Sequence, residues 1–212
     1  RTDEGIRGFL VEKGTPGYQA FDISGKYSHR ASVTSGLMLD EVRVPAENLL
    51  PGTEGLKSAL MCLNEARFGI AWGAVGAAMA CYEVALEYAK TRIQFEVPIA
   101  SFQLVQRKLV KMLSEITKAQ LLCIQLGRLK DEGNARHTQI SLAKMNNVSE
   151  ALKIARTARN ILGANGVALD YHVIRHMLNL EAVYTYEGTH DIHTLIVGRD
   201  ITGINAFSAK GS

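Results

Sequence analysis

The chain has 212 residues with a formal net charge of +3, and 47% of its residues are hydrophobic. That length allows one large domain, or one domain with part of another, with ample apolar surface for a core. Its lysines and arginines form no basic blocks and are not interleaved with aromatic residues, which excludes a typical nucleic-acid-binding surface. The three cysteines, Cys62, Cys81 and Cys123, are far apart and lie among apolar residues. This spacing argues against a disulfide framework or a zinc site and favours a reducing compartment.

The start of the chain carries neither an initiator Met nor a signal-peptide pattern, and Arg1-Thr2-Asp3 runs almost at once into Gly5–Phe9. We therefore expect a fragment of a longer protein. The most apolar stretch, Ile70 to Cys81, is shorter than a membrane-spanning segment and is rich in Gly and Ala. This composition favours close helix packing, and we expect no membrane insertion.

Residues 1–53 differ in texture from the rest, because they hold three of the four prolines and many glycines. Between these breakers lie short segments rich in β-forming residues, namely Gly8–Glu12, Ser32–Thr34 with Leu37–Leu39, and Val42–Val44. The pattern predicts a few short antiparallel strands, too few to be stable alone. We interpret residues 1–53 as the C-terminal part of a β-domain whose other strands lie upstream.

After Gly52 the apolar residues recur at helical spacing. The first predicted helix covers Leu56–Thr91, the second opens at Pro98 with Ser101 as its N-cap, and the third ends before Gly163. Shorter helices begin near Asp170 and Glu187. The expected buried stripes are Ala59, Leu63, Ala66, Ile70, Ala74, Ala77, Cys81, Ala85 and Ala89; Val105, Leu109, Met112, Ile116, Ala119, Cys123 and Leu126; and Ile140, Ala143, Asn147, Ala151, Ile154, Ala158 and Ile161. Residues 54–212 are therefore predicted to form an antiparallel helical bundle, which makes the chain mainly α.

One carboxylate stands out in the segment Tyr186-Glu187-Gly188-Thr189, directly before the last predicted helix. Glu187 lies at a helix entrance, where backbone N–H groups are unpaired. In a pocket that excludes water, such a carboxylate could act as general base for a weakly acidic C–H. Alternatively, it only stabilises the helix start through the helix dipole. The local pattern leaves both interpretations open.

Two further segments have a ligand-binding and a structural interpretation. Arg92-Ile93-Gln94-Phe95 follows the first helix and could clasp a phosphate beside a stacking aromatic ring, or could be a helix-end cation with a buried Phe. Gly163–Gly166 follows a helix and not a strand, so a dinucleotide-binding loop is a poor fit. A helix C-cap with a left-handed glycine is the default prediction.

Isolated polar residues inside the helices also need partners. Arg67 interrupts a small, apolar face, and its partner is either an acid of the bundle or a ligand phosphate. His172 and His176 are four residues apart, but the adjacent Glu and a third ligand are missing, so we predict no metal site.

Taken together, four motifs resemble the acyl-CoA dehydrogenase family over essentially the whole chain. They are Arg92-x-Gln94-Phe95-x-x-Pro98-Ile99, Phe102-Gln103, Leu162–Gly166 and Tyr186–Thr189, in the family's order and at its separations. Within the family, the chain is most similar to the glutaryl-CoA dehydrogenase branch, on the segments Asn64–Gly73, Tyr171–His176 and Thr189–His193.

This resemblance implies a middle β-domain ending at residue 53, a C-terminal all-α domain over 54–212, and FAD-dependent α,β-dehydrogenation of a CoA thioester. Glu187 would be the general base, the β-hydrogen would leave as hydride to the flavin, and glutaryl-CoA would go on to lose carbon dioxide and give crotonyl-CoA. The implied cofactor contacts are Arg92 (to a neighbouring subunit's FAD), Gln94, Phe95, Gln103, Asn160, Ile161, Leu162, Gly163, Ala164, Thr189, His190 and Asp191. The implied substrate contacts are Leu60, Leu63, Asn64, Arg67, Tyr186 and Gly188.

The resemblance further implies a homotetramer, an electron-transfer flavoprotein as electron acceptor, a role in lysine and tryptophan degradation, and a bacterial cytoplasmic or mitochondrial matrix location. Two alternatives stay open: a short- or branched-chain acyl-CoA dehydrogenase, or a catalytically silent helical oligomerisation module. The chain departs from the family pattern at Glu96, where Gly is usual, at Ala164, where a Gly-Asn-Gly triplet usually begins, and at Asn160, where Gln is common.

Overall fold

The computed structural model describes residues 5–206, so the first three residues discussed above lie outside the described part of the chain. The chain divides into two compact units, one ending at Leu63 and the other starting at Asn64. This boundary falls inside the long helix α1 (Lys57–Thr91). The predicted division into domains at residues 53 and 54 stays a prediction.

The first unit contains one antiparallel pair, β1 (Tyr18–Asp22) and β2 (Ser35–Leu39), with Tyr18 opposite Leu39. The predicted antiparallel strands are thus present, but two of their positions are wrong. Phe9 in the segment 8–12 makes only an isolated bridge to Leu49, and Val42–Val44 forms no strand. Strand β1 was missed because it starts directly after Gly17, in a segment that reads as a turn.

Gly17 explains how β1 can begin so close to the end of β2. Its φ of +84° is in the left-handed region, and an added Cβ would collide with the backbone oxygen of Asp40. The loop between the strands is closed by Lys26, whose ammonium donates to the Ser32 carbonyl and to the Thr34 hydroxyl, each at 2.6 Å. A 3-10 turn, η1 (Ala46–Asn48), completes the unit.

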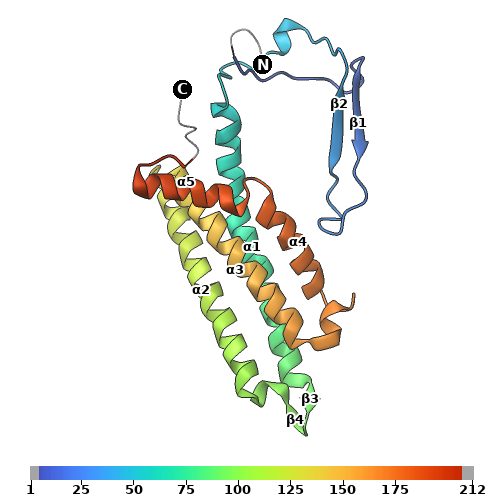
Figure 1. The fold of residues 1–212 in the computed structure, drawn as a ribbon, viewed down its shortest axis with the longest axis vertical. Helices are drawn as coiled ribbons and strands as arrows, with labels where there is room; N and C mark the ends of the chain where they lie inside the picture. The colour runs from blue at the N-terminus through green and yellow to red at the C-terminus, as the bar shows by residue number, and fades with distance from the viewer. Residues whose placement is uncertain (1–4, 207–212) are drawn as a thin grey trace. The chain divides into compact units, whose positions relative to one another are not determined.

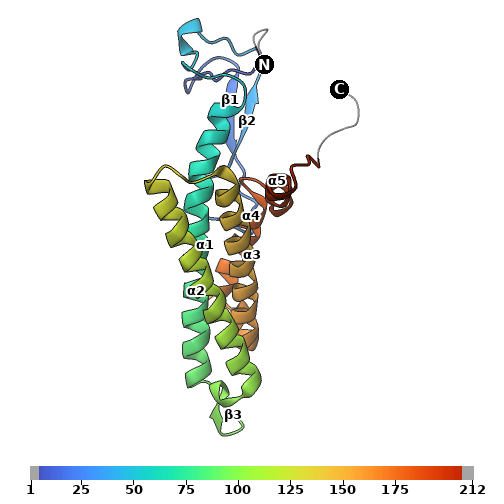
Figure 2. The same cartoon turned by 90° about the vertical axis from the view of Figure 1, so that its left-hand side faces the viewer.

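The second unit is an antiparallel bundle of α1, α2 (Gln103–Asp131), α3 (His137–Ile161) and α4 (Val173–Thr185), as Figure 1 shows. Helix α5 (His190–Thr202) lies across one end of the bundle, and a hairpin of β3 (Ile93–Gln94) and β4 (Val97–Pro98) lies at the other end (Figures 1 and 2). The 3-10 turns η2 (Ile99–Ser101) and η3 (Gly163–Val167) connect the helices near the hairpin. The predicted helical bundle is confirmed.

Helix α3 is the central element, because 13 of its 25 residues are buried and it packs against α2, α4 and α5. The predicted stripe of α3 is buried in full, and that of α2 is buried except for the half-buried Val105. On α1 the prediction holds only for its second half. Nearer the start of α1, Arg67, Ala71 and Val75 are buried instead of Ala66 and Ile70.

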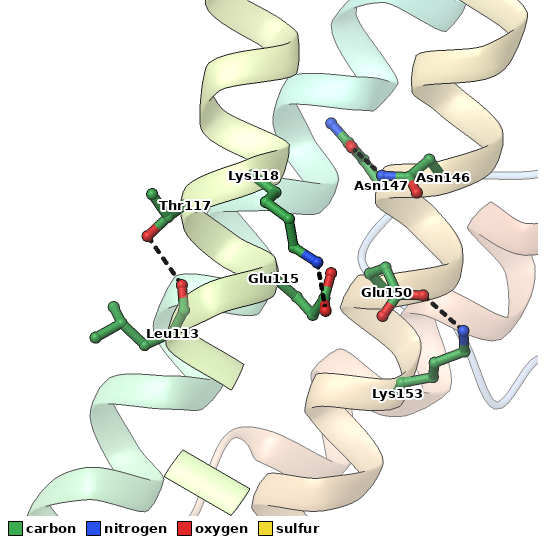
Figure 3. A network of polar contacts seen from close by, with 8 residues as sticks. All are labelled: Leu113, Glu115, Thr117, Lys118, Asn146, Asn147, Glu150 and Lys153. Atoms are coloured by element: carbon green, nitrogen blue, oxygen red, sulfur yellow. Dashed lines mark hydrogen bonds and ion pairs between the residues drawn. The ribbon is translucent and has the colours of Figure 1, made fainter. Parts of the chain in front are cut away.

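A buried amide joins three helices at the centre of the bundle. Asn147 of α3 is 1% exposed, and its side-chain NH₂ donates to the Ala71 carbonyl of α1 at 3.3 Å and to the Cys123 sulfur of α2 at 3.1 Å. Its oxygen accepts from the Asn146 side chain at 3.0 Å (Figure 3). Because a buried amide needs partners, these contacts fix the axial alignment of the helices.

Around this amide the surface pairs contribute much less to stability. Lys118 pairs with Glu115 at 2.7 Å and Lys153 with Glu150 at 2.6 Å, each one helical turn apart. Figure 3 shows both pairs. Both lysines are well exposed, and such pairs are worth less than about 1 kcal/mol.

Two predictions at helix ends have different outcomes. Gly163 has a φ of +60°, which confirms the left-handed glycine after α3. Ser101 as N-cap of the second helix is wrong, because its hydroxyl donates to the Pro98 carbonyl at 2.7 Å and α2 begins two residues later.

The β3–β4 hairpin was not predicted, because its turn lacks the usual residues. Phe95 and Glu96 have φ values of +52° and +68°, a conformation that normally selects Gly, Asn or Asp at both positions. The family's usual Gly at position 96 would adopt this φ without strain.

Helix α1 is, among the described residues, the single helix long and apolar enough to cross a membrane by length and composition. The expectation that no stretch reaches that length therefore holds for Ile70–Cys81 but not for α1 as a whole. One such helix is weak evidence, because the core helix of a soluble protein passes the same test. The absence of membrane insertion stays a prediction.

Two glycine substitutions should shift stability in opposite directions. At Gly166 an added Cβ would collide with the Arg159 backbone of α3, so Gly166→Ala should lower the free energy of unfolding by about 1–3 kcal/mol. At Gly127, within α2, no atom lies within 4 Å of an added Cβ. Gly127→Ala should therefore raise the free energy of unfolding by about 0.5–1 kcal/mol. Urea denaturation measures both, and equal losses in the two variants would contradict this packing of η3 on α3.

Candidate active site

Glu187 lies in the short connection between α4 and α5, where the backbone reverses direction. Its φ is +53° and that of Gly188 is +94°, so two successive residues are left-handed. A non-glycine residue in this region costs energy and is most often found at functional sites. Thr189 is the N-cap of α5, and its hydroxyl oxygen accepts from the Ile192 N–H at 3.2 Å.

The three carbonyls of this connection are bound by two buried cations. The Arg67 Nε of α1 donates to the Glu187 carbonyl at 2.8 Å. The Lys144 ammonium of α3 donates to the carbonyls of Tyr186 and Gly188 at 3.0 and 2.9 Å. Arg67 is 7% exposed and Lys144 is 1% exposed. Such charge-assisted bonds, shielded from water, hold the strained backbone in place.

The sequence left open whether Arg67 pairs with an acid or with a ligand phosphate. Burial lowers the pKa of Arg67, and the negative charge of Glu187 opposes that shift. Its guanidinium also donates weakly to the Asn64 side-chain oxygen, at 3.5 Å. In the described residues, the partner of Arg67 is therefore the Glu187 segment, both its backbone oxygen and its charge.

Lys144 was not singled out from the sequence. Its pKa is lowered to about 8, mainly by burial and also by the Arg67 charge, while the Glu187 charge opposes both effects. A signal was available, because Lys144 follows Ile140 by four residues and precedes Ala151 by seven, on the stripe predicted to be buried. A lysine on such a stripe is seldom without an internal partner.

His193 of α5 lies directly beneath Gly188 and is fully buried. A Cβ at Gly188 would lie 2.9 Å from the His193 Nε2, so only glycine fits there. Burial lowers the pKa of His193 to about 4, and the charges of Lys144 and Arg67 act in the same direction. The imidazole is therefore neutral at physiological pH. The sequence pattern did not predict that His193 packs in neutral form beneath Gly188.

The Glu187 side chain is only partly accessible to solvent. One of its oxygens, Oε2, is buried and has no hydrogen-bond partner among the described residues. Thr189 is the N-cap of α5, and stabilisation of the helix start by the Glu187 charge stays a prediction. Because a buried carboxylate oxygen without a partner is costly, this geometry favours a position held ready for a ligand.

An aromatic stack closes the connection on both sides of Glu187. The rings of Tyr184, at the end of α4, and His190, at the start of α5, are parallel within 8° with centroids 4.6 Å apart. Tyr186 is partly exposed, and burial together with the Glu187 charge raises its pKa.

A second candidate site is a cavity of about 360 Å³ at the hairpin end of the bundle. It is lined by Tyr88, Arg92, Gln94, Ile99, Ile161, Leu162, Gly163, Ala164 and Asn165. The structure thus brings together six of the predicted cofactor contacts: Arg92, Gln94 and the run from Ile161 to Ala164. The Asn165 amide donates to the Tyr88 hydroxyl at 3.1 Å and fixes one wall.

Six of the predicted cofactor residues lie outside this lining, and three of them, Phe95, Gln103 and Asn160, belong to segments next to it. Phe95 is 86% exposed and contacts Phe102 edge-on, so its interpretation as a buried residue is wrong. Asn160 accepts from the Lys108 ammonium at 2.6 Å, and Gln103 is the first residue of α2.

The two candidate sites lie at opposite ends of the bundle. At about 1.5 Å per residue, the stretch of α1 from Arg67 to Thr91 spans roughly 36 Å. The predicted cofactor contacts Thr189, His190 and Asp191 are at the Glu187 end. The predicted substrate contacts Asn64, Arg67, Tyr186 and Gly188 are also at that end. Leu60 and Leu63 belong to the first unit and are not placed relative to Glu187.

The two histidines considered as metal ligands, His172 and His176, lie at the start of α4. Within residues 5–206, no group of three or more His, Cys, Asp or Glu side chains is arranged to hold a metal ion.

The helical bundle thus holds Glu187 on a strained turn beside two buried cations, with one carboxylate oxygen shielded from solvent. Residues 53–202 match the family model of the acyl-CoA dehydrogenase C-terminal domain. The chain belongs to the acyl-CoA dehydrogenase family.

Solved structures and relatives agree with this membership. A glutaryl-CoA dehydrogenase from Mycobacterium smegmatis is 56% identical with a TM-score of 0.96, over 98% of this chain and 54% of that one. A glutaryl-CoA dehydrogenase from the same organism, in complex with FADH2, is 52% identical with a TM-score of 0.96, over 98% and 54%. A short-chain specific acyl-CoA dehydrogenase from Megasphaera elsdenii is 35% identical over 198 residues, 92% of this chain and 51% of the relative. The chain therefore spans about half the length of these proteins.

The buried His193 should make the protein sensitive to acid. Its pKa is about 4 in the folded state against an ordinary 6.5, so the unfolded chain binds the proton first as pH falls. Between pH 6.5 and pH 4 this costs the folded state up to about 3 kcal/mol. His193→Asn should lose less stability over that range in urea denaturation, whereas the variant His172→Asn, at an exposed position, should behave like the unmodified protein. A parallel acid loss in His193→Asn would contradict this assignment.

Proposed function

We propose that this chain is the C-terminal part of an FAD-dependent acyl-CoA dehydrogenase of the glutaryl-CoA type, with Glu187 as general base. The observation that carries the proposal is the Glu187 Oε2, buried without a hydrogen-bond partner among the described residues. A carboxylate oxygen in that state is free to accept a proton, as abstraction of the α-proton of a thioester requires.

The backbone around Glu187 supports binding of a thioester. In a trans peptide the N–H points away from the carbonyl of the same unit, and the described chain has no cis peptides. The carbonyls of Tyr186, Glu187 and Gly188 face the buried Lys144 and Arg67. The N–H groups of the following residues therefore point away from these cations. Such N–H groups suit the developing negative charge on a thioester carbonyl oxygen.

The cavity at Arg92 fits the charged part of a flavin dinucleotide. It combines a guanidinium with backbone that the left-handed Gly163 leaves uncovered, a donor set suited to a pyrophosphate. Bound FAD would supply the hydride acceptor. The similar glutaryl-CoA dehydrogenase from Mycobacterium smegmatis, solved in complex with FADH2, supports this cofactor. In this chain Arg92, Gln94 and Gly163 would hold one end of an FAD molecule, and Thr189, His190 and Asp191 would approach the other end of a second FAD molecule.

The separation of these two groups supports an oligomer. FAD is much shorter than the roughly 36 Å of α1 between them, so one molecule could not touch both groups on a single chain. We therefore propose that Arg92 contacts the FAD whose flavin lies at Glu187 of a neighbouring subunit. A homotetramer accommodates this arrangement. An electron-transfer flavoprotein as electron acceptor, and a bacterial cytoplasmic or mitochondrial matrix location, are also part of the proposal and rest on family membership.

The base assignment predicts a selective loss of chemistry. In the FAD-loaded protein, expressed from its complete reading frame, Glu187→Gln should keep the shape and thioester affinity but abolish flavin bleaching by glutaryl-CoA, by at least about a thousandfold. The matched variant Glu181→Gln, on the exposed face of α4, should bleach normally. Normal turnover in Glu187→Gln would refute the base. Bound flavin and turnover in the 212 residues alone would refute the view that the remainder of the protein is required.

The substrate assignment predicts a second product. With carboxyl-labelled glutaryl-CoA, the FAD-loaded protein should release labelled carbon dioxide in step with flavin reduction, because the enoyl thioester formed is activated for loss of its distal carboxylate. Bleaching by butyryl-CoA together with no carbon dioxide from glutaryl-CoA would instead establish the short-chain alternative, which the Megasphaera elsdenii relative represents.

A further inference from the structure

Lys144 is the one fully buried cation of the bundle in the described residues, and it makes no ion pair there. Both of its hydrogen bonds go to backbone carbonyls, those of Tyr186 and Gly188, on either side of Glu187. Burying an ammonium costs free energy, and an apolar side chain of similar size at position 144 could pack in α3 without that cost. Its retention needs an explanation beyond stability.

We propose that Lys144 is a positioning residue for the Glu187 site. This role rests on the proposed function. By binding the carbonyls of Tyr186 and Gly188, its ammonium directs the N–H groups of Glu187 and Thr189 towards the substrate and holds the Glu187 carboxylate in its strained turn.

Lys144 acts on these peptide units in two ways. First, each bound carbonyl belongs to the same peptide unit as the following N–H, so fixing the oxygen fixes the direction of the donor. Second, a cation at a carbonyl oxygen polarises that peptide unit and strengthens its N–H as a donor, because hydrogen bonds in chains reinforce one another. Arg67 does the same for the intervening unit, through the Glu187 carbonyl.

The groups around Lys144 also predict how it responds to pH. From α1 it faces Arg67, from the α4–α5 connection Glu187 and the Tyr186 backbone, and from α5 His193. With a pKa of about 8, its ammonium loses a proton in mild alkali, well before an exposed lysine does. The neutral amine still has two N–H groups, so the hydrogen bonds weaken without disappearing. An arginine at this position would stay charged throughout.

The first test does not use activity. Hydrogen exchange of the protein should show the peptide 184–193 opening about 10–100-fold faster in Lys144→Met, because two charge-assisted bonds are lost. Lys144→Arg should restore much of the protection. Lys153→Met, at an exposed lysine of the same helix, should exchange like the unmodified protein. Unchanged exchange at 184–193 in Lys144→Met, or an equal increase throughout α1–α3, would overturn the proposal.

The second test uses the FAD-loaded protein from its complete reading frame. With glutaryl-CoA, Lys144→Met should slow flavin reduction about 10–100-fold while the dissociation constant of the thioester changes less than about threefold. Flavin reduction in the unmodified protein should decline above about pH 8, and in Lys144→Arg that decline should move upward. An equal effect on rate and affinity, with an unmoved pH profile, would leave only a packing role. If the unmodified protein reduced no flavin, the proposed function would fail, while hydrogen exchange would still decide the role of Lys144.

Discussion

The bond between buried cations and the backbone of residues 186–188 is the constraint on which the site depends. Arg67 comes from α1, Lys144 from α3, and the turn itself joins α4 to α5. Helices α1 and α3 thus place two positively charged side chains against one short turn. Without them the left-handed Glu187 would relax towards ordinary backbone, and its carboxylate would turn to water or to the start of α5.

The helices of the bundle were predicted from the sequence better than the candidate active site was. Periodic apolar residues were enough to place α1, α2 and α3, because long amphipathic helices have a strong signal. The hairpin at Phe95 and Glu96 was missed, since its turn uses residues that seldom adopt positive φ. Strand β1 was missed because it starts directly after Gly17, in a segment with the composition of a turn.

At the site, single motifs were ambiguous and only their combination was informative. Glu187 alone fitted a helix start as well as a base, and the buried Oε2, which supports the proposed base, is visible only in the folded chain. The partner of Arg67 is 120 positions away along the chain. No local pattern encodes such a contact. Lys144 was the exception, because a lysine on an apolar stripe could have been noticed from spacing alone.

The stack of Tyr184 on His190 has a consequence for how the connection can change through evolution. The two rings face each other across the turn with their planes nearly parallel, one at the end of α4 and one at the start of α5. An inserted or deleted residue between them would rotate one ring away from the other and carry the three carbonyls out of reach of Arg67 and Lys144. The length of this segment therefore cannot vary.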